Sequence, residues 1–472
     1  MLEGLEIVEL NSNDFRFDNF DFRLDSEYFK KSNLELLEKL NIIGYKKIGD
    51  FSYVTDGIHT SIDYSETSNI NLISATSPRE IFFDVSRKAF ITELAHKNNP
   101  RTAIQENDII LSTVGTIGNC AVATKSILPA NSDRHVGIIR CNDEFSPNYV
   151  STFLLSKYGR FQTWRESTGN VQLNLFIYKI RTLKIANLSN SFQGTIDNLI
   201  KEGHSKRQKS IEIYLTSETL LLETLGLNNF EPTAEAVNIK SFKESFLSSG
   251  RLDAEYYQKK YEEITARIKL HNYAQLGNLV DIKKSIEPGS DAYQEEGVPF
   301  IRVSNLNKMG LSEPDIHLDG AKYKDVVKPR KDTILLSKDG SVGIAYKVTE
   351  DMDAITSGAI LHLSVKTDDV LPDYLTLVLN SKVVQMQAER DAGGSILQHW
   401  KPSEIAQVEI PIIDKQIQQE IASLVSESLT LKKQSEQLLE TAKRAVEIAI
   451  EDEEENAFQF IENAKKQQTT NN

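Results

Sequence analysis

The amino-acid sequence predicts an α+β protein: two similar mixed α/β domains joined by two long antiparallel coiled-coil helices with pseudo-twofold symmetry. Three observations predict this fold. The chain contains an internal repeat, each copy contains short apolar runs closed by glycine turns, and each copy ends in a long stretch with heptad-like spacing. The 472 residues are enough for two to four domains.

The internal repeat has a period of about 225 residues. Residues 22–29 (FRLDSEYF) recur as 250–257 (GRLDAEYY), and residues 109–118 recur as 334–343 at a shift of 225. Because the shift changes by only three residues along the chain, we interpret the sequence as a tandem duplication. A unit of this length is too long for a solenoid repeat, so each copy is predicted to be one domain with its connector.

Both copies are predicted to begin with a short helix and to continue with short strands. The helix has Asp25 or Asp253 as its N-cap, followed by glutamate and aromatic residues. The apolar runs at 109–111 and 334–336 are typical of buried strands, and each is followed by a Gly-x-x-Gly turn.

Further elements follow in the same order. Helices are predicted over 147–158 and 372–384 because each range opens with proline, which is favoured at the first helical position. Residues 409–412 predict an edge strand in the second copy, and a long helix follows it.

This last helix has the clearest periodicity in the chain. Its apolar and small residues alternate steps of four and three, as in the a/d seam of a coiled coil. The seam consists of Ile417, Ile421, Leu424, Ser428, Leu431, Ser435, Leu438, Ala442, Ala445 and Ala449. The first copy has a looser version, interrupted by Gly203: Ile196, Leu199, Ile200, Ile211, Tyr214, Leu215, Leu221 and Leu222. Because so narrow a seam suits another helix better than a globular face, we predict that the two helices pair; the alternative is that each packs on its own domain.

These elements divide the chain into six segments. They are an N-terminal segment with a short helix (1–44), a first globular domain (45–188), central helices (189–272), a second globular domain (273–412), a C-terminal helix (413–466) and a tail (467–472).

Composition excludes several classes of protein. The net charge of -14 excludes a generally basic DNA-coating protein, although residues 45–185 carry 16 basic against 13 acidic side chains. No run of 18 apolar residues predicts a membrane span, and no signal peptide is predicted. With only two cysteines, the simplest expectation is a cytoplasmic protein.

Motifs for catalysis are missing from the sequence. There is no P-loop and no Asn-Pro-Pro-Tyr-like tetrapeptide of the amino-methyltransferases, and the glycines of 115–118 do not have dinucleotide-binding spacing. The eight histidines form no metal-ligand spacing, and Asp281-Ile282-Lys283 lacks the second acid of a nuclease. We therefore predict no catalytic residue, no metal and no cofactor in this chain.

Several stretches resemble the specificity (S) subunit of type I restriction-modification systems. They are 55–60 (TDGIHT), 297–306 (GVPFIRVSNL), 169–174 (GNVQLN) and 394–399 (GSILQH), with the duplicated order around them. The resemblance implies a non-catalytic subunit of a phage-defence complex that methylates adenine in DNA. It also implies that the two domains are target recognition domains on double-stranded DNA and that the long helices are spacers.

The resemblance further implies the partners of the chain. Two methyltransferase (M) subunits, which carry S-adenosylmethionine, dock on the spacers, and motor-nuclease (R) subunits join in the restriction complex. A helix of about 35 residues spans roughly 50 Å, or about 15 base pairs, so the pair could hold two domains over an asymmetric bipartite site. The alternatives are a stand-alone methyltransferase or nuclease, and a coiled-coil adaptor that binds only protein.

Candidate base-reading residues are polar side chains in predicted loops. In the first copy they are His59, Thr60, Ser74, Thr76, Arg79, Arg134, His135, Gln172 and Asn174. In the second copy they are Lys283, Lys284, Arg302, Ser304, Asn305, Lys308, Lys338, Gln398 and His399. Candidate partner-binding residues are Ile417, Ile421, Leu424, Leu431 and Leu438. Gln172 and Asn174 could instead fix the fold, and Arg302 could belong to an ion pair. Trp164 and Trp400 are expected to be core or helix-packing residues and not base-stacking ones.

Overall fold

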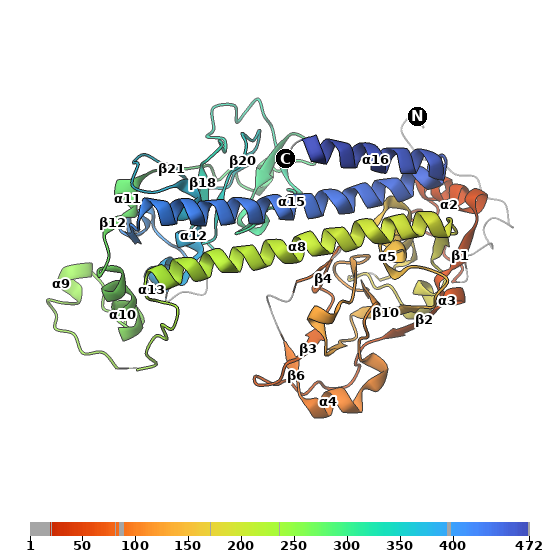
Figure 1. Cartoon of the computed structure of the whole chain (residues 1–472), viewed down its shortest axis with the longest axis horizontal. Coiled ribbons are helices and arrows are strands. Elements are labelled where there is room, and N and C mark those ends of the chain that lie inside the picture. Colours follow the sequence, from red (N-terminus) through yellow and green to blue (C-terminus); the bar gives the residue numbers. More distant parts are fainter. Residues whose placement is uncertain are drawn as a thin grey trace. The chain divides into compact units, whose positions relative to one another are not determined.

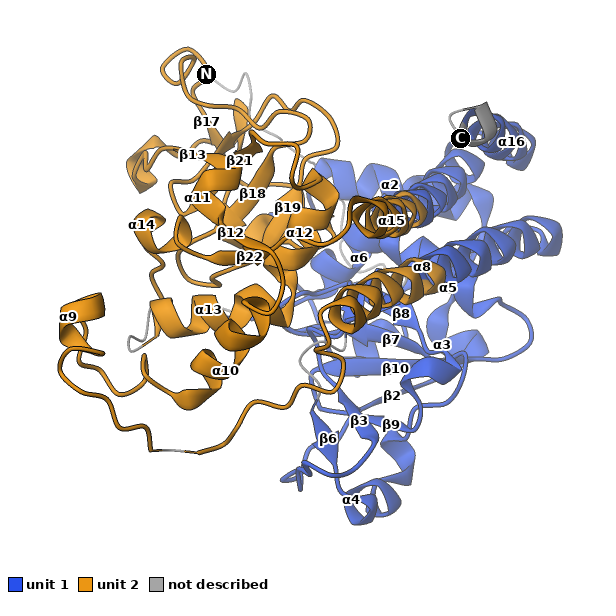
Figure 2. Cartoon of the chain, turned by 60° about the vertical axis from the view of Figure 1, so that its left-hand side comes forward, with its two compact units in different colours: residues 1–207, 433–472 blue, residues 208–432 orange. Residues whose placement is uncertain are grey.

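The computed structural model describes residues 19, 21–80, 82–84, 89–169, 171–235, 237–393 and 398–470, with side chains as far as 467. The described chain forms two compact units (Figure 2). Unit 1 contains residues 1–207 and 433–472, and unit 2 contains residues 208–432.

The centre of unit 1 is a four-stranded antiparallel sheet. Its strands, in spatial order, are β2 (Ser52–Asp56), β10 (Val136–Cys141), β7 (Ile109–Ser112) and β8 (Cys120–Val122). Every residue of β7 is buried, which confirms the strand predicted at 109–111. A run without polar alternation is expected for a strand that is covered on both faces.

Smaller sheets complete unit 1. A three-stranded sheet has the order β6 (Phe90–Ile91), β3 (Ile70–Ile73) and β9 (Ala130–Ser132), and β3 and β9 run parallel. Strand β1 (Tyr45–Lys47) pairs with β11 (Lys184–Ala186), and β4 (Pro78–Arg79) forms a hairpin with β5 (Phe82–Phe83). The helices of this part are α2 (Lys31–Ile43), α3 (Ile48–Phe51), α4 (Glu93–Asn98), η1 (Pro100–Thr102), η2 (Lys125–Ile127), α5 (Pro147–Leu155), α6 (Lys157–Glu166) and α7 (Ile177–Ile180).

Unit 2 repeats this strand order. Its four-stranded sheet consists of β13 (Val280–Lys284), β21 (Ile360–Val365), β18 (Ile334–Ser337) and β19 (Ala345–Lys347). Its three-stranded sheet consists of β17 (His317–Leu318), β14 (Val298–Ile301) and β20 (Ile355–Thr356), and again one pair, β14 with β20, is parallel. The remaining pairs are β12 (Tyr273–Gln275) with β22 (Glu409–Pro411), and β15 (Leu306–Asn307) with β16 (Gly310–Leu311). Its short helices are α9 (Phe246–Ser249), α10 (Lys259–Ile268), α11 (Leu276–Leu279), η3 (Ser290–Ala292), η4 (Val303–Asn305), α12 (Pro372–Asn380), α13 (Lys382–Ala392) and α14 (Pro402–Ile405).

Hydrogen bonds repeat along with the strands, at the shift of 225. The Tyr149 hydroxyl donates to the Ala186 carbonyl at 2.7 Å, and the Tyr374 hydroxyl donates to the Pro411 carbonyl at 2.8 Å. All four residues are buried. A buried tyrosine needs a hydrogen-bond partner, so the two units solve the same packing problem in the same way.

Two details of the predicted helices are wrong. Asp25 does not cap a helix: its Oδ1 accepts the Tyr28 amide within a turn, and α2 begins only at Lys31. The helices predicted over 147–158 and 372–384 each break, because Ser156 and Ser381 adopt extended backbone conformations between two shorter helices.

The long helices are α8 (Asn190–Thr224) and α15 (Lys415–Glu451), followed by α16 (Glu454–Thr470) (Figure 1). The segment 413–466 is therefore not one helix as predicted, because the helical conformation stops at Asp452 and Glu453. The boundary between the units falls inside both long helices, after residue 207 in α8 and after residue 432 in α15.

Small residues form the contact between the long helices in each unit. In unit 2 the Ser210 and Ser428 hydroxyls donate to each other's backbone carbonyl, both at 2.7 Å. In unit 1 the Ser435 hydroxyl donates to the Gly203 carbonyl at 2.7 Å. Gly203 is thus part of the seam and does not interrupt it, because a residue without a side chain lets the helices approach closely. The predicted seam residues Ile211 and Leu215 are instead exposed.

Candidate nucleic-acid interface

The parallel strand pair of unit 1 brings three loops together at one end. The Asp133 amide donates to the Ile73 carbonyl at 2.9 Å, and the Ile58 amide donates to the Ser132 carbonyl at 2.8 Å. The carboxyl ends of β3 and β9 therefore lie at the same edge as the loop after β2. We call residues 57–60, 74–76 and 133–135 the first loop cluster.

The first loop cluster contains six of the predicted residues. His59, Thr60, Thr76 and Arg134 are exposed, and Ser74 and His135 are half-buried. The Ser74 and Thr76 hydroxyls lie 3.2 Å apart, and the guanidinium of Arg134 donates to the His135 ring at 3.3 Å. Donors and acceptors of this kind can read base edges or phosphates.

Asp56 and Arg101 belong to this site and were missed in the sequence. The Asp56 carboxylate contacts His59 Nε2 at 2.5 Å and the Arg101 guanidinium at 2.6 Å. Burial opposes ionisation of Asp56, but the hydrogen bonds from Arg101 and His59 outweigh it and lower the pKa of Asp56. Arg101 lies 42 positions from His59, and no spacing in the sequence links the two.

The remaining candidates of unit 1 are Arg79, Gln172 and Asn174, which lie outside the first loop cluster. Arg79 is on β4, 4.0 Å from Asp84, and Gln172 is exposed. The Asn174 side chain donates to the Gln172 carbonyl at 3.0 Å, and its backbone bridges to Thr168. Asn174 therefore holds its own loop, which favours the structural role over base reading.

Unit 2 has an equivalent second loop cluster, which we define as residues 285–288, 302–304 and 357–359. The Ser357 amide donates to the Ile301 carbonyl at 2.9 Å, and the Gly358 amide donates to the Ile286 carbonyl at 2.6 Å. Arg302 and Ser304 follow β14 as Ser74 and Thr76 follow β3 in unit 1. Arg302 is half-buried and pairs with Asp315 at 2.8 Å, so its alternative role in an ion pair is realised in the free chain.

Three predictions in unit 2 are corrected by burial or by a different partner. Asn305 is 6 % exposed: its Oδ1 accepts the Arg302 amide at 2.9 Å, which turns the chain after β14. Lys338 is 4 % exposed and pairs with Asp339. Lys308 is exposed, but it is directed to Glu218 on α8, at 3.0 Å. All three side chains have a partner within the protein.

The other candidates of unit 2 are exposed. Lys283 and Lys284 lie on β13, and His399 pairs with Asp339 beside the turn after β18. Gln398 is exposed, and its backbone carbonyl accepts a hydrogen bond from the Gly340 amide at 3.0 Å. The neighbouring residues 394–397, which were part of the predicted motif, lie outside the described residues.

The candidate partner-binding residues of α15 fall into two groups. Ile421 and Leu438 are buried in the cores of units 2 and 1, so they hold their own units together. Ile417 is half-buried against the core of unit 2. Leu424 and Leu431 are half-buried on the same helix and keep part of their surface accessible.

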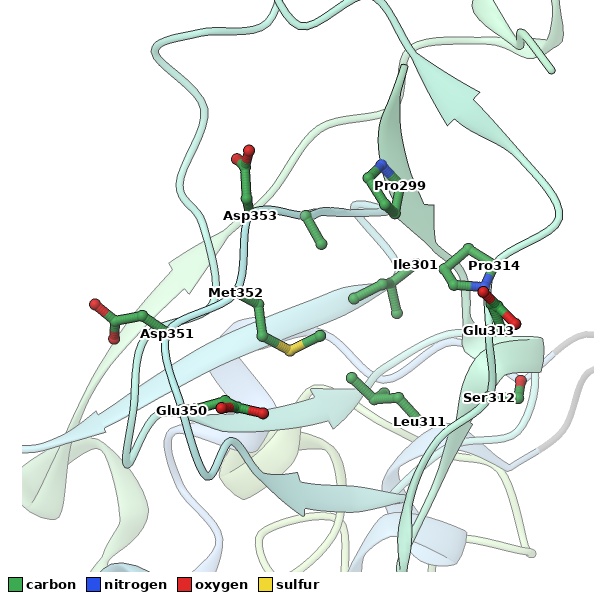
Figure 3. Close-up of a pocket in the computed structure, with 11 residues that line it drawn as sticks. Pro299, Ile301, Leu311, Ser312, Glu313, Pro314, Glu350, Asp351, Met352 and Asp353 are labelled. Carbon is green, nitrogen blue, oxygen red and sulfur yellow. The ribbon is translucent and has the colours of Figure 1, made fainter. Parts of the chain in front are cut away.

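A cavity in unit 2 has the wrong charge for nucleic acid (Figure 3). Its floor is apolar, with Ile301, Leu311 and Met352, whereas its rim includes Glu313 and Asp351. Because acidic side chains repel phosphate, this cavity does not suit a nucleic acid.

No group of three His, Cys, Asp or Glu side chains among the described residues could hold a metal ion. No helix within those residues is long and apolar enough to cross a membrane.

His362 makes unit 2 sensitive to acid. It is 2 % exposed on β21, and its Nε2 lies 2.7 Å from the Thr356 hydroxyl. Burial, helped by the charge of Lys283, lowers the pKa of His362 from 6.5 to about 4. Between these pH values the unfolded chain binds a proton that the folded chain does not, so the free energy of unfolding falls as the pH falls.

We expect the unfolding free energy of unit 2 to fall by about 2 kcal/mol between pH 7.5 and pH 5 because of this residue. His362→Gln keeps a partner for Thr356 and should remove that part of the pH dependence, which urea unfolding at both pH values measures. An unchanged slope in the variant would show that another group is responsible.

Residues 271–441 match the family model described as "Type I restriction modification DNA specificity domain". No curated protein matches the chain. Among solved structures, the chain is similar to the type I restriction-modification S subunit from M. genitalium, with 11% identity and a TM-score of 0.37, covering 89% of this chain and 95% of that one.

The HsdS subunit from Thermoanaerobacter tengcongensis is also similar, with 13% identity and a TM-score of 0.28, over 87% of this chain and 97% of that one. The match to the family model is confined to one part of the chain. It covers the second copy, including β12 to β22 and most of α15. Residues 271–441 of this chain are therefore similar to the type I restriction modification DNA specificity domain.

Proposed function

We propose that the chain reads an asymmetric, bipartite site in double-stranded DNA, with one half-site bound by each loop cluster. The observation that carries the proposal is the equivalence of the two clusters. Ser74 in unit 1 corresponds to Arg302 in unit 2, and Thr76 corresponds to Ser304. All four residues follow equivalent parallel strands. A shared scaffold with different side chains supports two half-sites of different sequence, because base contacts depend on the side chain.

Charge supports local binding over coating of DNA. The whole chain has a net charge of -14, so phosphate contacts are expected from a few exposed residues such as Arg134 and Lys284 and from partner chains. Each correct base contact discriminates by about 1–3 kcal/mol, so neither cluster alone would be selective. Because both clusters lie on one chain, the free energies by which they discriminate between base sequences add together.

The long helices are proposed to hold the two clusters at a fixed distance. Both helices continue through the boundary between the units, at residues 207 and 432. A helix that is continuous and paired through small residues resists bending better than a flexible linker. The pair would act as a spacer that sets the number of base pairs between the half-sites.

The experiment that tests this function is an exchange of residues 45–188 for the same segment of a relative with a known site. We expect the complex to methylate a new site in which only one half has changed, because the second loop cluster stays intact. Methylation sequencing of a host that expresses the chimera with its partner subunits measures the site. A change in both halves, or in neither, would contradict independent reading by the two clusters.

The proposed partners are two methyltransferase (M) subunits, which hold S-adenosylmethionine and carry out adenine methylation, and motor-nuclease (R) subunits in the restriction complex. Their docking surface is proposed to include Leu424 and Leu431 on α15, where large apolar side chains keep accessible surface. Apolar surface of this kind on a helix supports a helical partner.

Leu424→Asp combined with Leu431→Asp should weaken co-purification of the methyltransferase subunit at least tenfold, because each buried carboxylate would need desolvation. The matched control is Thr430→Asp, which adds an acid at an exposed position of the same helix. Circular dichroism checks that the helices remain. Normal co-purification of the double variant would place the docking surface elsewhere.

A further inference from the structure

The two hairpins that follow the loop clusters have the same geometry. In β4–β5 the paired residues are Pro78 with Phe83 and Arg79 with Phe82. In β15–β16 they are Leu306 with Leu311 and Asn307 with Gly310, which are the same positions at the shift of 228. The turn positions Glu80 and Lys308 are therefore equivalent.

In unit 1 the hairpin contacts both long helices. Lys443 Nζ on α15 lies 3.7 Å from Glu80 Oε1. The Arg207 guanidinium on α8 lies over the Phe82 ring, 4.6 Å from its centre. The hairpin thus connects the first loop cluster to the helices that are proposed to hold it.

In unit 2 the equivalent hairpin makes equivalent contacts. Lys308 Nζ lies 3.0 Å from Glu218 Oε1 on α8 and 4.6 Å from the centre of the Tyr214 ring. A Cβ built on Gly310 would lie 3.3 Å from Lys432 Nζ on α15, so this side of the hairpin also meets a helix. Position 310 is equivalent to Phe82, and position 432 is equivalent to Arg207.

The ion pairs are equivalent but their charges are exchanged. Glu80 corresponds to Lys308 at the shift of 228, and Lys443 corresponds to Glu218 at the shift of 225. In unit 1 the acid Glu80 of the hairpin thus faces Lys443, which also pairs with Glu440 on its own helix at 2.5 Å, whereas in unit 2 the base Lys308 of the hairpin faces the acid Glu218. Lys443 is 17% exposed and Glu218 is 23% exposed, so solvent screens both helix charges only in part.

We infer that this reversed ion pair is a positional key that lets each recognition domain dock only on its own pair of helix halves. A first domain placed on the second position would set Glu80 against Glu218, and a second domain placed on the first would set Lys308 against Lys443. Like charges at these positions repel, which disfavours the wrong docking. Glu80, Lys308, Glu218 and Lys443 act as positioning residues and do not need to touch DNA.

The key would also control how precisely the half-sites are spaced. A hairpin that is held to its helix fixes the direction in which the neighbouring loop cluster faces. Loosening the hairpin should leave the bases that are read unchanged but should widen the range of gaps that are accepted. This consequence for DNA rests on the proposed function, whereas the docking itself does not.

The first experiment uses the full chain without DNA. We expect Lys308→Glu to raise deuterium exchange in the hairpin 306–311 about three- to tenfold, because it faces Glu218 with a like charge. Adding Glu218→Lys should restore most of the protection, since the pair is then reversed but intact. Lys324→Glu, the same charge change at an exposed position of the same unit, is the control. If the double variant does not recover the protection, the inference that the reversed ion pair determines docking is wrong.

The second experiment replaces residues 273–412 by a second copy of 45–188, so that Glu80 meets the helix at Glu218. Adding Glu218→Lys should lower deuterium exchange in the transplanted hairpin about three- to tenfold relative to the chimera on the native helix. If the transplanted hairpin exchanges equally fast with and without Glu218→Lys, the inference that the reversed ion pair determines docking is wrong.

The third experiment measures the gap in the assembled complex. Duplexes carry the site found by methylation sequencing of the host, with the native gap or with one base pair more. The preference for the native gap should fall about threefold in Lys308→Glu and return in the double variant. An unaltered preference, with wild type binding normally, would overturn the role of the key in spacing. Failure of the wild type to bind either duplex would instead count against the proposed function, and the exchange results would still test the key.

Discussion

Replacing Trp400 with alanine is expected to destabilise unit 2 by about 3–5 kcal/mol. Trp400 is fully buried in the core of that unit and is one of its largest side chains. Its amide donates to the Lys338 carbonyl at 2.8 Å, and its indole N–H points to the Asp391 carboxylate at 3.4 Å. The substitution therefore leaves a large cavity and removes a hydrogen bond to the buried carboxylate of Asp391.

Asp391 adds to this effect. Burial raises the pKa of Asp391, while Arg390, at 2.7 Å, and the Trp400 indole lower it. Removing the indole takes one hydrogen-bond donor away from the buried carboxylate of Asp391. A buried acceptor without its donor lowers the free energy of unfolding. Phenylalanine at position 400 should recover most of the packing but not the hydrogen bond.

The matched control is Trp164→Ala. Trp164 lies on α6 and is 54% exposed, so it is not part of the buried core, and its loss should cost less than about 1 kcal/mol. Deuterium exchange of β18 and β21 measures the stability of unit 2, and that of β7 and β10 measures the stability of unit 1. Similar losses for the two tryptophan variants would contradict the packing described here.

Inserting one heptad into both long helices is expected to lengthen the gap between the half-sites by about three base pairs. Seven helical residues add about 10 Å, and a heptad keeps the same residues in the seam. The insertions belong next to residues 207 and 432, where the unit boundary crosses the helices. Small seam residues such as Ser210 and Ser428 stay paired if both helices are lengthened together.

Methylation sequencing of the host measures the new gap. The bases of the two half-sites should stay the same, because neither loop cluster is altered. Insertion into α15 alone is the control: it shifts the register of one helix past the other and should abolish methylation. A complex that methylates with an unchanged gap would refute the spacer function of the helices.

Much of the fold followed from local patterns in the sequence. The buried strands at 109–111 and 334–336 are confirmed because an apolar run before a glycine turn has few alternatives in a folded chain. The long helix predicted from residue 417 onward is confirmed over Lys415–Glu451, because its periodicity extends over many turns. Details at helix ends, such as the turn at Asp25, depend on single hydrogen bonds and were predicted less well.

The candidate site was predicted only in part. Ser74 and Thr76 follow β3, which pairs with β9, and the loop of His59 reaches the end of β9 through the hydrogen bond from Ile58 to Ser132. Their polar character marked these residues in advance. Asn305 and Lys338 have the same polar character but are buried with internal partners. Residue type identifies what a side chain can bind, but it does not say whether the side chain faces solvent.

The sequence by itself determined that the chain is a duplicated α+β protein with long helices and without motifs for catalysis, because repeats, periodicity and turns are encoded over short distances. Only the tertiary structure decided which residues share a loop cluster, that Arg101 joins His59 at Asp56, and that Lys308 pairs with Glu218. These contacts join residues far apart in the chain. Their partners are set by the pairing of parallel strands and the packing of hairpins on helices, neither of which leaves a local pattern in the sequence.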